Sequence, residues 1–158
     1  MASLGKKQAL AALALMLLDG EERARIKRRN RRVWVRGWIA RRQEMGAFHR
    51  IVRELATEDP SSFMEYLRMD EDHFNHLVSL VSPLIKKEDT CMREAISPAE
   101  RVALTLRFLA TGESFHSLAF QFRISRHAIS YIVDETCAAI TEVITYIHTY
   151  IHTYIHIY

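Results

Sequence analysis

Turn-forming residues are scarce in this chain, and that scarcity restricts its fold more than any other feature. Only 5 glycines and 3 prolines occur in 158 residues, well below their usual share. Few turns disfavour an all-β chain and favour long helices. Hydrophobic residues make up 49% of the chain, which is enough for a core and excludes wholesale disorder. No apolar run reaches the roughly 18 residues that span a bilayer, so we expect no transmembrane segment. We therefore predict an all-α protein.

The spacing of apolar residues predicts a helical bundle over residues 46–144. Phe48, Ile51, Val52 and Leu55 recur at i, i+3, i+4 and i+7, the spacing of one helix face. The pair at residues 59–60, Asp-Pro, should end this helix and lead into a short turn through Phe63, Tyr66 and Leu67. A second helix is expected from an N-cap at Asp70 to a stop near Pro83, with an apolar face made by Phe74, Leu77, Val78 and Val81.

A capping box marks the start of a third helix after a polar connector at residues 86–96. Ser97 and Glu100 flank a proline at the first helical position, so hydroxyl and carboxylate can both satisfy backbone N–H groups. Gly112 is the expected C-cap. The helix between them is apolar nearly all round, which predicts a central, buried position. Its apolar residues include Val102, Leu104, Leu106, Phe108 and Leu109.

Residues 114–140 have the pattern of a helix-turn-helix. Ser114 and Ser125 can each cap a helix, and residues 123–125 between the two helices are short enough for a tight turn. Arg123 stands where glycine is more usual. In this arrangement the N-terminal side chains of the second helix reach base edges in the major groove. Those side chains are Arg126, His127, Ser130 and Tyr131. The alternative is an ordinary helical hairpin whose residues simply face solvent.

Basic residues are concentrated in the N-terminal segment, residues 1–45. Residues 23–42 contain ten of them and no acid, which indicates a polyanion partner or a nuclear import signal. The alternative is a solvated helix face. The apolar stretch at residues 9–18 is similar to a signal peptide, but the acids that follow it favour an Ala/Leu-rich helix instead. The basic residues that we expect to contact DNA are Arg28, Arg29, Arg31, Arg32 and Arg36.

The last residues, 145–158, repeat the tetrapeptide Thr-Tyr-Ile-His and form a low-complexity tail. A tetranucleotide DNA repeat translates into this sequence, so we interpret the tail as a translated microsatellite outside the folded unit. The rival interpretation is a metal site, because His148, His152 and His156 recur every four residues. No carboxylate or cysteine joins them, and we predict no metal site. Two cysteines without a CxxC motif indicate a reduced, intracellular compartment.

Several motifs together resemble the N-terminal half of the PIF/Harbinger transposase-derived nucleases. They are Trp-x-Arg-x-Trp at residues 34–38, Tyr-Leu-Arg-Met at residues 66–69, the run from Ile96 to Gly112, and the helix ending near residue 140. The resemblance covers about residues 23–143. Gly37 stands where this family would have proline.

The resemblance implies a nuclear protein that binds double-stranded DNA, and a DDE nuclease domain that would use divalent Mg²⁺ or Mn²⁺. It also implies a Myb/SANT-like companion protein. No strand pattern with acids follows the helix-turn-helix, so we expect a chain truncated before the catalytic domain and assign no catalytic residue and no cofactor. Glu135 matches a family motif and is expected to be a surface acid. The alternative is a helical module that docks the companion without touching DNA.

Overall fold

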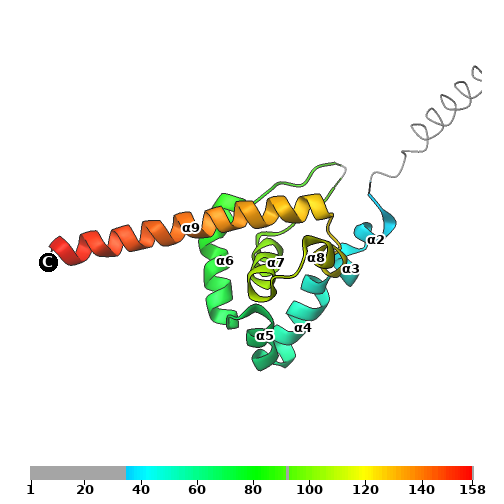
Figure 1. Cartoon of the computed structure of the whole chain (residues 1–158), viewed down its shortest axis with the longest axis horizontal. Helices are drawn as coiled ribbons and strands as arrows, with labels where there is room; N and C mark the ends of the chain where they lie inside the picture. The colour runs from blue at the N-terminus through cyan, green and yellow to red at the C-terminus, as the bar shows by residue number, and fades with distance from the viewer. Residues whose placement is uncertain (1–34, 92, 158) are drawn as a thin grey trace, which may run out of the picture. The chain divides into compact units, whose positions relative to one another are not determined.

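The computed structural model describes residues 35–91 and 93–157, with side chains as far as Tyr150. It divides the chain into two units, Met1–Arg36 and Gly37–Tyr158, and the second contains all the helices of the described residues. The regular structure of the described residues is entirely helical, with eight α-helices and one π-helical turn (Figure 1). Apart from an isolated bridge between Thr90 and Arg93, these residues contain no β-pairing. The prediction of an all-α fold is confirmed.

The second unit opens with short elements, one of which shifts the predicted helix face. The elements are α2 (Gly37–Ala40), α3 (Arg42–Met45), the π-helical turn η1 (Phe48–Val52) and α4 (Arg53–Glu58). Phe48 and Val52 are buried as predicted, and Leu55 packs against the core. Ile51 was predicted to share this face, but it is 43% exposed. The wider π turn rotates Ile51 outward, because it places more residues in each turn than an α-helix does.

Aspartate caps start the next two helices, α5 (Pro60–Leu67) and α6 (Glu71–Ile85). The side chain of Asp59 accepts a hydrogen bond from the Ser62 N–H at 3.1 Å, and that of Asp70 accepts one from the His73 N–H at 2.8 Å. The predicted cap at Asp70 is therefore confirmed, whereas the segment predicted as a short turn after residue 60 is an eight-residue helix. Pro83 lies inside the last turn of α6, which ends two residues later.

Helix α7 (Pro98–Thr111) occupies the centre of the unit. It contacts η1, α5, α6 and the two helices that follow, α8 (Phe115–Phe122) and α9 (Arg126–Ile157). Both predicted ends are confirmed. At the start, the Ser97 hydroxyl accepts a hydrogen bond from the Glu100 N–H at 3.2 Å. At the end, Gly112 is the C-cap, with a left-handed φ of 64°. Leu104 is fully buried, but Leu106 is only half-buried and Leu109 is 59% exposed. The helix is therefore central, as predicted, with one face open to solvent.

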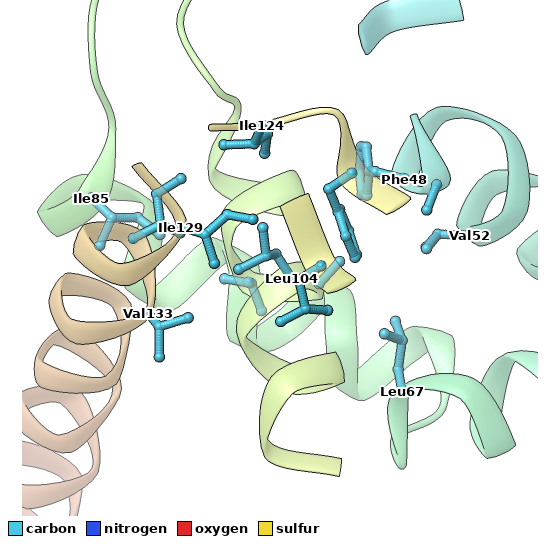
Figure 2. Close-up of a cluster of buried hydrophobic side chains, with 14 of the residues drawn as sticks. Phe48, Val52, Leu67, Ile85, Leu104, Ile124, Ile129 and Val133 are labelled. Carbon is cyan, nitrogen blue, oxygen red and sulfur yellow. The ribbon is translucent and has the colours of Figure 1, made fainter. Parts of the chain in front are cut away.

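A single cluster of apolar side chains joins these helices (Figure 2). Leu104 of α7 lies in the middle of the view, with η1 on one side and the start of α9 on the other. Burial on this scale is the dominant stabilising term for a domain of this size. The labelled members are Phe48, Val52, Leu67, Ile85, Leu104, Ile124, Ile129 and Val133.

Helix α9 is 32 residues long and includes the predicted low-complexity tail. Its first half packs against α6, α7 and α8, and its second half extends past them (Figure 1). Among the side chains that the structure describes in the tail, those of residues 145–150 are exposed. These side chains therefore lie outside the core, and α9 continues into the tail as a helix.

Candidate nucleic-acid interface

The turn between α8 and α9 is formed by three residues with distinct roles. Arg123 adopts a left-handed conformation with φ of 54°, which ends α8. Ile124 is 2% exposed and fixes the turn to the core. Ser125 caps α9, its hydroxyl accepting the Ala128 N–H at 3.3 Å. The turn is thus as short as predicted, with arginine in the conformation that glycine adopts most readily.

The side chain of Arg123 ties this turn to the beginning of the unit. Its guanidinium donates hydrogen bonds to the carbonyl oxygens of Trp38, at 2.9 Å, and Met45, at 3.2 Å. Gly46 lies close by, and a Cβ added there would come within 3.2 Å of the Phe122 carbonyl oxygen. These contacts hold the end of α8 against α2 and α3, although some 80 residues of sequence separate them.

The side chains of the first two turns of α9 lie on two faces, one toward the core and one toward solvent. Ile129 and Ile132 are buried, together with Val133. The predicted contact residues lie on the other side: Arg126, His127 and Tyr131 are exposed and Ser130 is half-buried. The structure therefore brings these four residues together on one helix face.

An acidic residue limits the length of this face. Asp134 is exposed one turn after Ser130, where its charge would oppose a phosphate. The part of α9 suited to an anionic partner is therefore its first two turns. The positive end of the helix dipole lies at the same place and favours the same charge.

Phe120 of α8 is an exposed aromatic side chain that the predicted site did not include. Phe120 is 61% exposed, and its ring centroid is 5.6 Å from that of Trp38 and 5.0 Å from that of His116. The apolar spacing of α8 (residues 115, 118, 119 and 122) leaves position 120 outside the core face. A phenylalanine off the apolar face of a helix is the signal that could have placed Phe120 on the surface, whereas its contact with Trp38 has no local signal.

The remaining predicted DNA-binding residues belong to the first unit. Arg36 is exposed. Arg28, Arg29, Arg31 and Arg32 lie outside the described residues.

A buried charged cluster joins α3, η1 and α7. Glu100 is 1% exposed, and one of its carboxylate oxygens is 3.7 Å from Arg42 Nε and 3.7 Å from His49 Nε2. Arg42 also donates to the carbonyl oxygens of Ala95, at 3.0 Å, and Glu94, at 3.4 Å. The capping-box prediction is thus correct for Ser97 but not for Glu100, whose carboxylate turns inward to this cluster instead of back to the helix start.

Burial sets the protonation of this cluster. The pKa of Glu100 is raised to about 7, because desolvation of the carboxylate outweighs the attraction of Arg42. The pKa of His49 is lowered by burial first, and then by Arg53 and Arg42. Both shifts reduce the charge of the Glu100 and His49 side chains, while the guanidinium of Arg42 is stabilised by hydrogen bonds to two backbone carbonyls.

A second ion-pair group fixes α9 to α7. Arg101 is 4% exposed and donates to Glu135, which also pairs with Lys87 at 2.6 Å. Glu135 was expected to be a surface acid, but it is half-buried. Its partners lie 34 and 48 residues away in sequence, so local pattern could not reveal them.

The described residues do not fit the divalent metal that the nuclease resemblance implies. Within them no group of three His, Cys, Asp or Glu side chains is placed to hold an ion. None of the helices searched in the described part of the chain is both long and apolar enough to cross a membrane.

No curated protein and no solved structure matches the chain. A family model described as a domain of unknown function (DUF8040) matches residues 45–142, which is more than half of the chain. The match covers η1 through α8 and the part of α9 that packs on the core. The chain therefore belongs to the DUF8040 family of domains.

Proposed function

We propose that this chain binds double-stranded DNA in the nucleus, as the DNA-binding and protein-interaction half of a Harbinger transposase-derived nuclease. The observation that carries the proposal is the face formed by Arg126, His127 and Tyr131 at the start of α9. The helix presents them at a fixed angle, because Ile129 and Ile132 anchor its opposite side in the core. Such a fixed helix face is what insertion into a major groove requires.

The basic segment would supply affinity that does not depend on DNA sequence. Residues 23–42 carry ten basic residues, enough to bind several phosphates, each of which releases counterions when it is neutralised. We assign the nuclear import signal to the same segment. The α9 face would then add hydrogen bonds to base edges, which carry sequence information.

The test measures binding to a labelled duplex by fluorescence anisotropy at several salt concentrations. Arg126→Gln should raise Kd roughly tenfold, as expected when one good hydrogen bond to a base or phosphate is removed. Arg68→Gln is the matched control, since Arg68 is also exposed but lies between α5 and α6, at the other end of the unit (Figure 1). Equal affinities of the two variants would contradict the proposed face.

A second arm tests the basic segment. Replacing Arg28, Arg29, Arg31 and Arg32 together by Ala should weaken binding to all duplex sequences. It should also reduce the slope of log Kd against log salt by about 0.9 for each phosphate that the variant no longer binds. The same variant should fail to accumulate in the nucleus. Unchanged binding with unchanged accumulation would contradict this part of the proposal.

The exposed aromatic side chains favour a second candidate, in which a Myb/SANT-like companion docks on α8. Phe120 beside Trp38 offers the type of aromatic anchor that protein interfaces favour. Under this candidate, Phe120→Ala abolishes companion binding, and the isolated chain shows no salt-dependent affinity for duplex DNA. A steep salt slope for the chain alone would exclude the form of this candidate in which only the companion touches DNA.

A further inference from the structure

The apolar face of α9 does not end where the core ends. Ile129, Val133 and Thr136 are buried, and Ile140 and Val143 are half-buried against the core. The same alternating spacing of four and three residues then continues through Ile147 and Tyr150, and in sequence through Tyr154 and Ile157. This is the spacing of the seam along which two helices pack in a coiled coil.

Beyond Val143 the rest of the unit no longer covers this face. Ile147 is 39% exposed and Tyr150 is 60% exposed, and their neighbours Ile144 and Tyr146 are 59% and 72% exposed. Figure 1 shows this half of α9 extending past α6, α7 and α8. A run of large, exposed apolar side chains on one extended helix is typical of a surface that binds another protein.

We propose that this partner is a second copy of the chain, with the two α9 extensions packed against each other. Glu142 is the last charged residue in the sequence, so two copies of the extension meet without like-charge repulsion. Coiled coils between different chains commonly select their partner through charged residues beside the seam, and this segment contains no Asp, Glu, Lys or Arg.

The symmetry of such a pair adds to this self-complementarity. In a parallel pair with the two-fold axis along the seam, each apolar residue of the seam faces the same residue of the other copy. The extension spans only about two heptads, so the dimer should be weak and depend on protein concentration.

Sedimentation velocity across the micromolar range, on nucleic-acid-free protein, tests this proposal. The wild-type chain, of 18.4 kDa, should move from monomer to dimer as its concentration rises. Ile147→Glu places a carboxylate in the seam and should weaken dimerisation at least tenfold. Thr145→Glu adds the same charge to the same segment on the other side of the helix, and should leave dimerisation unchanged.

Thermal melting by circular dichroism accompanies the measurement, because both substituted positions are exposed and the folded unit should stay intact. The dimer should also persist at high salt, since no ion pair holds it. A wild-type chain that stays monomeric would overturn the proposal and leave the face to a different protein. Equal weakening by the two glutamate variants would also overturn it.

Discussion

Glu100 makes stability depend on pH through one buried carboxyl group. An unfolded glutamate releases its proton near pH 4.5, whereas folded Glu100 keeps it to about pH 7. Between these values the folded state binds more protons, so the free energy of unfolding falls as pH rises. His49 acts in the opposite sense, because its pKa is lowered and the unfolded state binds more protons below pH 6.5.

The variant Glu100→Gln should remove the first of these effects. Glutamine keeps the shape of the side chain and stays neutral at every pH. The free energy of unfolding of the variant should therefore rise relative to the wild type from pH 4.5 to above 7, by about 3–4 kcal/mol, because each pKa unit is worth about 1.4 kcal/mol. Urea unfolding of both proteins at a series of pH values measures the difference. A difference that stays constant with pH would contradict the raised pKa.

Two arginines with positive φ provide a matched pair for a second prediction. Arg68 and Arg123 have φ of 59° and 54°, and each ends a helix. Glycine at Arg68 should stabilise the protein by about 0.5–1 kcal/mol, because the left-handed conformation costs glycine nothing. Glycine at position 123 removes the same backbone strain, but it also removes the hydrogen bonds that the Arg123 guanidinium donates to the carbonyls of Trp38 and Met45.

Arg123→Gly should therefore be the less stable of the two variants by about 1.5–3 kcal/mol, the range of hydrogen bonds to a charged group. Chemical unfolding of both proteins under one condition gives this comparison. Equal stabilisation by the two glycines would show that the hydrogen bonds of Arg123 add nothing to stability.

At the scale of elements, α7 supplies the third prediction. Leu104→Ala should lower the free energy of unfolding by about 2–5 kcal/mol, because it leaves a cavity at the centre of the core. Leu109→Ala makes the same chemical change five residues later on the same helix, but on a side chain that is 59% exposed. It should cost less than about 0.5 kcal/mol. Similar destabilisation by the two variants would mean that α7 is not the central helix.

The helix ends were predictable because their causes lie within four residues. Ser97, Ser114 and Asp70 each accept a backbone N–H three positions ahead, which the sequence displays directly. Ile51 was not predictable, because a π turn changes the period on which the argument rests. Glu100 was not predictable either, since Arg42 and His49 reach it from more than 50 residues earlier.

The same distinction applies to the candidate interface. The outward position of Arg126, His127 and Tyr131 follows from helical period alone, and the structure places them so. The contact between Trp38 and Phe120 joins residues 82 positions apart, so no local pattern contains it. A single sequence thus predicts which residues face solvent, but it does not predict which distant residues come into contact.

For the whole molecule, we expect the extension of α9 to be dispensable for folding. A chain that stops at Ile144 keeps Val143 and all the buried residues of α9. Its free energy of unfolding should therefore lie within about 0.5 kcal/mol of the full chain, measured at concentrations where both are monomeric. It should also be more soluble and should not dimerise. A destabilisation as large as that of Leu104→Ala would show that the extension packs on the core.

The purified chain should bind DNA without cutting it. Of the acids on the last helix, Glu135 is held by Arg101 and Lys87, and Asp134 and Glu142 are exposed two turns apart. Two-metal hydrolysis requires converging carboxylates, which this arrangement does not offer. Incubating a supercoiled plasmid with the chain and Mg²⁺ or Mn²⁺ checks this expectation. Nicking that copurifies with the chain and disappears in Asp134→Asn would contradict it.

The contacts of Arg42 determine where a fragment that contains this domain should begin. The family match starts at residue 45, yet Arg42 lies against Glu100 and binds the carbonyls of residues 94 and 95. The backbone of Trp38, further upstream, holds Arg123. A fragment or fusion that begins at the family boundary would discard both attachments, whereas one that begins at Gly37 retains them. Grafts of this domain onto other proteins should therefore start at least eight residues before the homology does.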